Sequence, residues 1–315
     1  MNDIHGRVYA DKSVVNVQDF TFAEADGGRY TAKGGMKFDD SRQLFGVLDV
    51  TNGSVKNLLT LLDRSNEHID GKLNGSVEIG GTRDNPSVNV TGKINDVSID
   101  EKIVGDATID ASLANRKFKV TTLKLPVDEG LIAIGGTMDL DGQADLQVAL
   151  KDVDIVPFLP LMGKDIQATG WVTGVVNITG ETKNPKVELS GAVESGSFNG
   201  VGIDEGFVLA TMQDQVIQIQ RIQGAKSGYK LSVYGKIPLA AIFTSGYIPA
   251  NDSKSMDVTI DFNEADMAVI PLLTTSVKEA TGPLKGTVHI TGTIDQPEAY
   301  GTVSVRNGTM KLASV

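Results

Sequence analysis

The chain has 315 residues, of which 35 are glycine, none is cysteine and 5% are aromatic, and its formal net charge at pH 7 is −11. This charge argues against direct binding to nucleic acid or to an anionic membrane surface, since both require Lys and Arg to neutralise phosphate. The lack of cysteine excludes a disulfide framework and a thiolate metal site. No run of 18 apolar residues occurs, and Met1–Ala10 lacks the apolar core of a signal peptide, so we expect no membrane-spanning segment in this sequence.

Short segments of alternating apolar and polar residues follow one another from Val15–Val17 to Val288–Ile290. This period of two is typical of strands in a sheet with one apolar and one solvated face. Dipeptides that favour two-residue hairpin turns mark turns in the pattern, so we expect antiparallel hairpins. These dipeptides are Asn52-Gly53, Asn74-Gly75, Asp141-Gly142, Asn199-Gly200 and Asn307-Gly308.

Three short apolar stretches have helical character, namely Val55–Arg64, Ile155–Lys164 and Met267–Ala280. Prolines at 157, 160 and 271 weaken the second and third as regular helices. We interpret the three stretches as apolar plugs that cover a sheet edge between repeat units. The alternative is direct contact with lipid or a membrane surface.

A glycine–proline frame, G-x3-G-x5-G-x4-P, occurs three times with every spacing kept, and each copy directly follows one of the helical stretches. A frame held this closely over roughly a hundred residues indicates a structural repeat. The frame positions are Gly71, Gly75, Gly81 and Pro86, then Gly170, Gly174, Gly180 and Pro185, then Gly282, Gly286, Gly292 and Pro297.

The frame predicts one continuous repeat array over residues 1–315, without Pro/Ser/Gly linkers between units. Residues 1–70 form a partial unit, 71–169 a full unit, 170–281 a unit with an inserted loop at 241–254, and 282–315 a partial unit. We interpret the chain as an excerpt from a longer repetitive protein.

The apolar faces of so many strands need cover, and the sequence offers almost no helix for that purpose. A barrel, a sandwich or an open trough would satisfy them. The inward positions are mostly Val, Ile and Leu, which would make a smooth lining suited to flexible hydrocarbon chains, although a dry, self-packed core is the alternative. The candidate lipid-binding residues are Val77, Ile79, Val88, Val90, Ile132, Ile134, Met138, Leu140, Leu146, Val148, Leu150, Val176, Ile178, Val187, Leu189, Val258, Ile260, Phe262, Val288 and Ile290.

Residues of the types used in catalysis or metal binding are scattered through the sequence. His5, His68 and His289 lie too far apart to suggest a triad or a zinc site. The run of Asp139, Asp141 and Asp145 resembles a calcium loop but lacks the remaining ligand spacing, so we interpret it as a hairpin turn. We therefore expect no enzyme, no cofactor and no metal site. Trp171 is adjacent to Val172 and would lie on the opposite face of a strand, so we expect it at a rim or on the outer surface.

The frame sequences GKLNGSVEIGGTRDNP and GPLKGTVHITGTIDQP resemble the TamB branch of the AsmA-like superfamily, and so does the apolar half-helix before the second frame, in VPFLPLMGKDIQATG. The resemblance covers the chain from about Gly6 to Met310. It implies an all-β fold: an elongated, repetitive antiparallel sheet curled into a trough with an apolar interior, with a few short helices between repeat units. It also implies the periplasmic part of an envelope protein, with an inner-membrane anchor outside this sequence and an Omp85-type outer-membrane partner.

Three classes of function are compatible with these features. The first is a non-catalytic bridge whose apolar groove binds phospholipid acyl chains and carries phospholipid between the inner and outer membranes. The second is a scaffold for outer-membrane protein assembly, which would offer strand edges to clients or to the Omp85-type partner. The third is an unrelated secreted β-repeat protein such as an adhesin. No nucleic-acid partner is expected.

Overall fold

The computed structural model describes residues 2–25, 27–61, 68–162, 167–198, 201–226, 229–242, 255–270, 276–293 and 296–312. The described chain is all-β, with 78% of residues in strands and 6% in helices, and the strands form open antiparallel sheet rather than a closed barrel. This confirms the expected fold class. The chain divides into two compact units, which are described separately: unit 1 is Met1–Val153 with Pro160–Met162 and Thr179–Lys183, and unit 2 is Asp154–Leu159, Gly163–Ile178 and Asn184–Val315.

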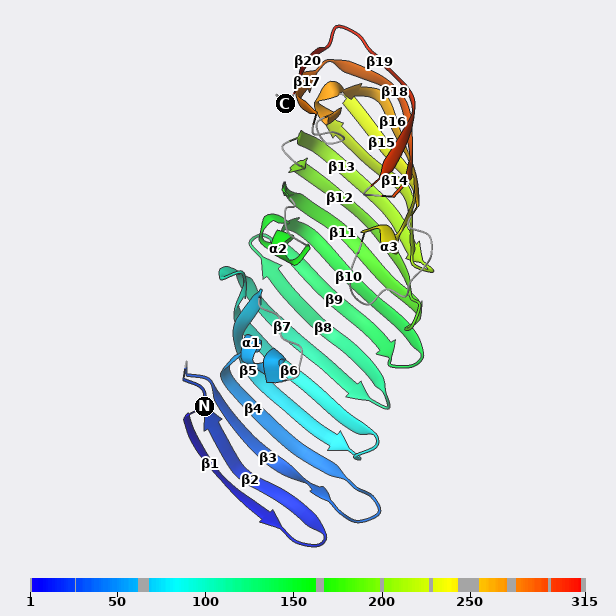
Figure 1. Ribbon diagram of the computed structural model, residues 1–315. Coiled ribbons are helices and arrows are strands. Elements are labelled where there is room, and N and C mark those ends of the chain that lie inside the picture. Colours follow the sequence, from blue (N-terminus) through cyan, green and yellow to red (C-terminus); the bar gives the residue numbers. More distant parts are fainter. Residues whose placement is uncertain are drawn as a thin grey trace. The chain divides into compact units, whose positions relative to one another are not determined.

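Unit 1 is an antiparallel meander in which each strand pairs with the next one along the chain (Figure 1). One short helix interrupts it between the fourth and fifth strands. The elements are β1 (Asn2–Ala10), β2 (Val14–Ala23), β3 (Arg29–Lys37), β4 (Leu44–Ser54), α1 (Val55–Leu61), β5 (Ile69–Gly81), β6 (Pro86–Ile99), β7 (Lys102–Ala114), β8 (Lys117–Val127), β9 (Gly130–Asp139) and β10 (Gln143–Asp154).

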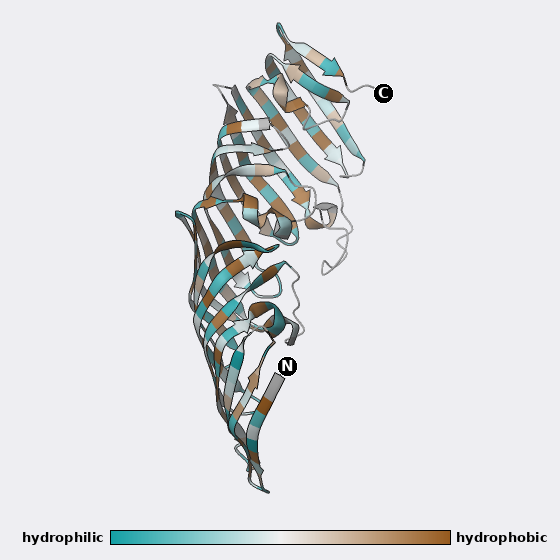
Figure 2. Cartoon of the chain, turned by 90° about the vertical axis from the view of Figure 1, so that its left-hand side faces the viewer, coloured by the Kyte–Doolittle hydropathy of each residue, from teal (hydrophilic) through white to brown (hydrophobic). Residues whose placement is uncertain are grey.

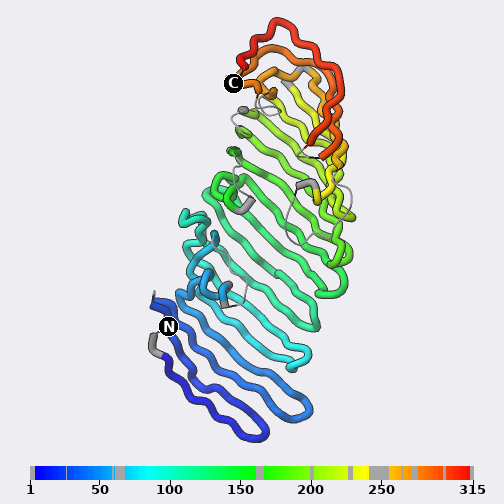
Figure 3. The backbone as a smooth tube through the Cα atoms, in the orientation of Figure 1, coloured from blue at the N-terminus to red at the C-terminus, as the bar shows by residue number. Residues whose placement is uncertain are grey.

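In unit 2, successive strands from β12 to β16 also pair with one another (Figure 3). A bent hairpin follows, with β17 and β18 on one side and β19 and β20 on the other. In it β18 pairs with β19, and β16 pairs with β18. Beyond the bend, β17 pairs with β20 as a separate two-stranded sheet. The elements after β10 are η1 (Val156–Phe158), α2 (Leu159–Met162), β11 (Ala168–Glu181), β12 (Lys186–Phe198), β13 (Val201–Gln213), β14 (Val216–Lys226), β15 (Tyr229–Pro238), α3 (Leu239–Ile242), β16 (Met256–Asp266), η2 (Met267–Val269), β17 (Val277–Thr281), β18 (Pro283–Gly292), β19 (Pro297–Val305) and β20 (Thr309–Leu312).

The third frame glycine has the same backbone role in each copy. Gly81, Gly180 and Gly292 have φ values of 79°, 88° and 82°, a region that glycine enters without steric cost. In the first copy the turn that follows is closed by Thr82 N–H to Asn85 O (3.1 Å) and Asn85 N–H to Thr82 O (3.2 Å). Thr293 and Gln296 make the same two bonds in the third copy, at 3.3 and 3.2 Å. The frame therefore encodes the tight hairpin that ends at its proline.

The hairpin dipeptides are only partly confirmed. Asp141-Gly142 forms the turn between β9 and β10, whereas Asn52-Gly53 and Asn74-Gly75 lie inside β4 and β5, so the two turns expected there are wrong. Asn52 has φ 53° at a bulge, and its N–H donates to the Asn74 side-chain oxygen at 3.0 Å. A left-handed Asn is compatible with a bulge as well as with a turn, and local sequence does not distinguish the two. Asn307-Gly308 connects β19 to β20 without pairing them, and Asn199-Gly200 lies outside the described residues.

The three helical stretches are described in part, and residues 62–64, 163–164 and 271–275 of them lie outside the described residues. α1 begins at Val55 because the Ser54 hydroxyl caps it, accepting from Asn57 N–H at 3.2 Å, and Asp70 accepts from Lys56 N–H. The second stretch gives only η1 and α2. For the third, a helix through Ala280 is wrong: η2 covers three residues, and Val277–Thr281 forms β17, whose backbone bonds are satisfied by β20. α3 was not expected from the sequence.

Candidate functional site

Three rows of apolar residues cross unit 1, each made of residues that face one another directly on successive strands. Opposed residues of an antiparallel pair lie on the same face, so each row lines one face of the sheet. The first row is Val8, Val17, Gly34, Gly46, Ile79, Val88, Leu113, Phe118, Met138 and Ala144. The second is Phe20, Ala32, Leu48, Val77, Val90, Ala111, Val120, Gly136 and Leu146, and the third is Phe22, Tyr30, Val50, Gly75, Gly92, Ile109, Leu123, Ile134 and Val148.

The candidate residues of unit 1 lie in these rows or beside them, with one exception. Ile132 faces Leu125 and Leu150 in a shorter fourth row. Leu140 is the exception, because β9 ends at Asp139 and Leu140 belongs to the turn, where its side chain is 43% exposed. The expectation that Leu140 is an inward strand residue is wrong, since the alternation continues in the sequence after the strand has ended.

The opposite face of unit 1 carries polar residues from β5 to β10, whereas the exposed Val47 of β4 lies opposite Glu78. A row of facing residues between the first and second apolar rows runs from β5 to β10 without an apolar member: Glu78, Asn89, Ser112, Lys119, Thr137 and Asp145. Figure 2 shows the resulting bands, in which hydrophobic segments of neighbouring strands line up across each sheet. The unit is therefore a one-sided sheet, as the alternation predicts.

The apolar face of unit 1 is incompletely covered. Val77, Val88, Val90, Ile134 and Val148 are all only half-buried, and Ile79 is 41% exposed. Five other members of the rows are buried, namely Tyr30, Val50, Ala111, Val120 and Ala144. The half-buried and exposed members leave part of the apolar face accessible to an apolar ligand.

Unit 2 carries two comparable apolar rows from β12 to β19. One is Leu189, Ala210, Ile219, Gly235, Val258, Ile290 and Ala299, and the other is Gly191, Val208, Ile222, Val233, Ile260, Val288 and Gly301. Val187 lies in a further row with Met212, Ile217 and Ile237. Val176 and Ile178 are half-buried residues of β11, which lies beside β12, as the 2.8 Å contact between the Thr169 and Ser197 hydroxyl groups shows.

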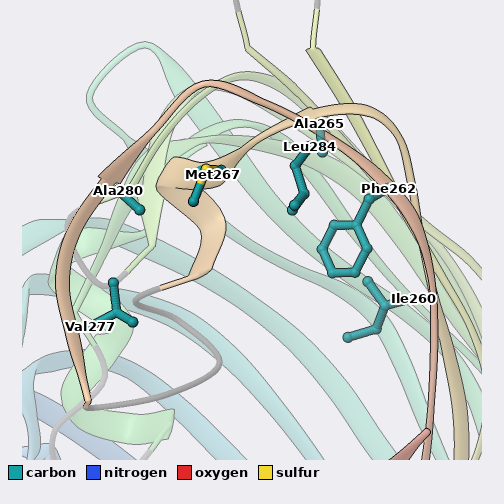
Figure 4. Packing of buried hydrophobic residues seen from close by; sticks show 7 residues of the cluster. All are labelled: Ile260, Phe262, Ala265, Met267, Val277, Ala280 and Leu284. Carbon is teal, nitrogen blue, oxygen red and sulfur yellow. The ribbon is translucent and has the colours of Figure 1, made fainter. Parts of the chain in front are cut away.

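One end of unit 2 is covered by an arch, defined as η2, β17 and β20. Met267, Val277 and Ala280 of the arch point toward Ile260, Phe262 and Leu284 of the sheet (Figure 4). Phe262 is 2% exposed and Leu284 is 1% exposed. At β16 and β18 the alternative of a dry, self-packed core is therefore correct, and the candidates Val258, Ile260 and Phe262 are packing residues in this conformation.

Sequence reasoning missed several members of the rows because bulges change the spacing. Val120 and Leu123 lie on the same face of β8, and Ile219 and Ile222 lie on the same face of β14, although each pair is three residues apart. A shift in register separates the members of each pair. A strict period of two assigns one member of each pair to the wrong face. A spacing of three between two apolar residues of one strand is the signal that the sequence offers.

Polar side chains outside the rows mostly stabilise turns and strands. Asp141 pairs with Arg116, and Asp139 with Lys117 at 3.6 Å, so both acids lie in ion pairs at the hairpin ends. His68 Nδ1 is hydrogen-bonded to Asp100 Oδ1 at 2.7 Å, and His289 Nε2 lies 3.6 Å from Asp257 Oδ1. Within the described ranges, no group of three or more His, Asp or Glu side chains could hold a metal ion. Trp171 is 46% exposed, as expected for a surface residue.

Comparisons with known proteins add no family. No protein-family model, no curated protein and no solved structure matches the chain. Among the residues that the structure describes, no helix has the length and apolar character needed to cross a membrane. The resemblance to the AsmA-like superfamily stays a prediction from the frame sequences.

Proposed function

We propose that the apolar rows bind lipid acyl chains and that the protein is a non-catalytic carrier of phospholipid. The observation that supports this most directly is the accessibility of the three rows of unit 1. Monomeric soluble proteins rarely leave contiguous apolar surfaces of this extent uncovered, and those that do use them for binding. Hydrocarbon chains need no hydrogen bonds, so a lining of Val, Ile, Leu and Gly satisfies them fully.

The rows would also allow a bound acyl chain to move along the sheet. Neighbouring strands lie about 4.8 Å apart, so a row of nine or ten strands offers an apolar path roughly 40 Å long. No charged residue interrupts the three rows. An acyl chain could therefore move along a row without meeting a desolvated charge, while its head group stays in water at the open side.

The cellular setting of this proposal comes from the resemblance to the TamB branch of the AsmA-like superfamily. In that setting the chain is the periplasmic part of a protein with an inner-membrane anchor. It carries phospholipid between the two membranes and works with an Omp85-type barrel protein.

The test is mass spectrometry of organic extracts from protein purified without detergent. Phospholipid should be recovered in a stable ratio to protein, and added phospholipid vesicles should restore it after delipidation. Protein that is folded, carries no lipid and takes none up from vesicles would contradict the proposal.

A further inference from the structure

The arch of unit 2 lies on an apolar row of the kind that would bind acyl chains. Ile260 belongs to the second row of this unit and forms one buried cluster with three residues of the arch, Met267, Val277 and Ala280 (Figure 4). Val288, which faces Ile260 in the same row, is packed against this cluster. The arch and an acyl chain would therefore compete for the same surface.

The arch is joined to the sheet at two facing glycines. Gly282 lies between β17 and β18, and Gly308 lies between β19 and β20. Gly282 has φ 121°, a region that glycine enters without steric cost, and a Cβ atom on it would lie 2.7 Å from Gly308 Cα. Both strands of the hairpin therefore bend at the same level, where neither residue has a side chain to restrict the backbone.

The bend recurs in the second copy of the frame. Gly170, the first frame glycine of that copy, has φ 136°, and a Cβ atom on it would lie 3.0 Å from Gly196 Cα of β12. In the first copy, the pairing of β5 with β6 changes register at Gly71. Because Gly282 is the first frame glycine of the third copy, its bend is a property of the repeat.

The contacts between the arch and the row are ones that hydrocarbon can replace. Val277 and Ala280 are 8% and 5% exposed and offer only apolar side chains. Apolar contacts are non-directional, so an acyl chain on Ile260 and Val288 would satisfy the row equally well. A hydrogen bond from Met267 N–H to the Gly282 carbonyl oxygen, at 2.8 Å, lies at the bend itself.

We propose that the arch is a cover of the second apolar row of unit 2, which turns about Gly282 and Gly308 and is displaced when an acyl chain enters the row. A ligand favours a state only through its higher affinity for that state, and here the acyl chain binds the row when the arch is open. This inference rests on the proposed binding of lipid. It makes access to unit 2 conditional on the arch, whereas part of the apolar face of unit 1 is accessible without such a step.

The test uses the full chain with vesicles of phosphatidylethanolamine and phosphatidylglycerol, and a photo-crosslinking amino acid at Val288 or at Val90 of unit 1. V277D places a charge on the arch side of the contact and should displace the arch, because the carboxylate would be desolvated there. We expect V277D to raise lipid attachment at position 288 by about threefold or more, as the open fraction rises. Attachment at position 90 should stay unchanged.

The matched control is E279A, on the same strand as Val277. Glu279 is exposed, and its ion pair with Lys311, at 3.8 Å, is exposed as well. Such surface pairs contribute little to stability, so E279A should change lipid attachment at neither position.

Hydrogen exchange of backbone amides follows the arch without lipid. In the unaltered protein, β17 should exchange faster than β16 and β18, because local opening exposes the arch and leaves the sheet intact. V277D should speed exchange in β17 further while β16 and β18 keep their protection. Equal exchange of the three strands in the unaltered protein would contradict a movable arch. Loss of protection in β16 and β18 of V277D would show that the arch is a fixed part of the core, which also overturns the inference.

The two positions separate this inference from the proposed function. Unchanged attachment at position 288 in V277D, with lipid attached at position 90, would overturn the role of the arch and leave the proposed function standing. No attachment at either position in folded protein would overturn the proposed function, and the role of the arch with it.

Discussion

Gly75 and Gly286, the second glycines of their frames, lie where the neighbouring strand leaves no room for a side chain. A Cβ atom at Gly75 would lie 2.3 Å from the Thr91 carbonyl oxygen, and one at Gly286 would lie 2.1 Å from that of Thr302. Contacts this short with backbone cannot be relieved by a rotamer change. These glycines therefore permit close approach of strands, whereas the third frame glycine permits a turn.

Gly75→Val should destabilise unit 1 by about 2 kcal/mol or more, because β5 and β6 must separate to accept the side chain. Gly80→Ala, on the same strand, is the control, since its Cβ would meet only the Ser87 hydroxyl at 3.0 Å. Urea unfolding measures the free energy of unfolding of both variants. Equal values for the two variants would show that the second frame glycine has no packing role.

Hydrogen bonds to Asp11, in the turn between β1 and β2, predict that the stability of this turn depends on pH. The Ser13 hydroxyl and backbone N–H both donate to its carboxylate at 2.7 Å, and the Tyr9 hydroxyl donates at 2.9 Å. These bonds, those from Ser13 above all, hold the pKa of Asp11 well below its usual value. Because the folded pKa is the lower one, the stabilisation is present above about pH 4 and is lost as the pH falls further.

An NMR titration of the Asp11 carboxyl group should therefore show a midpoint clearly below that of a model peptide. Ser13→Ala should raise the midpoint toward that of an unstructured peptide by removing one donor. An Asp11 midpoint in the unaltered protein close to that of the peptide would contradict these hydrogen bonds.

At the scale of elements, alternation predicted the strands and their two faces well. The apolar and polar partners of β5, β6, β9 and β10 could be read from the sequence because these strands pair with a regular register over most of their length. Bulges in β8 and β14 could not be predicted, because an extra residue in a strand changes parity without a distinctive composition. The arch was also missed, since its short apolar segments resemble a helix and its strands pair only with each other.

Because the arch covers only one of two leucines in the bent hairpin, we expect their replacement by Ala to change the free energy of unfolding to different extents. Leu284 is 1% exposed beneath the arch, whereas Leu312 of β20 is 66% exposed. Leu284→Ala should lower the free energy of unfolding of unit 2 by about 2–5 kcal/mol through lost contacts and a cavity. Leu312→Ala should change it by less than about 0.5 kcal/mol, as exposed sites usually do.

Urea unfolding compares the two variants with the unaltered protein. Similar losses at both sites would mean that the arch does not pack as described. Under the same reasoning, a charge at Ile260, which is 6% exposed, should unfold unit 2, so this position is unsuitable for testing lipid binding.

At the scale of the whole molecule, the proposed function rests on the difference between the two faces of the sheet. β6 offers a matched pair of neighbours: Val90 lies in the second apolar row between Val77 and Ala111, and Thr91 is exposed on the polar face. The sequence predicted many of the residues on the apolar face, but it placed Leu140 there wrongly and missed members next to bulges. It could not show that the apolar face of unit 1 stays accessible while part of unit 2 is covered, because coverage depends on segments distant along the chain.

The most direct test of lipid binding places a photo-crosslinking amino acid at Val90 or at Thr91 of the full chain, in cells or with phospholipid vesicles. After irradiation, mass spectrometry of the protein identifies any attached lipid. Attachment of phospholipid acyl chains at position 90, and at most a few per cent of that yield at position 91, is the result that this account predicts. Equal yields at both positions, or no lipid at position 90 in folded protein, would contradict it.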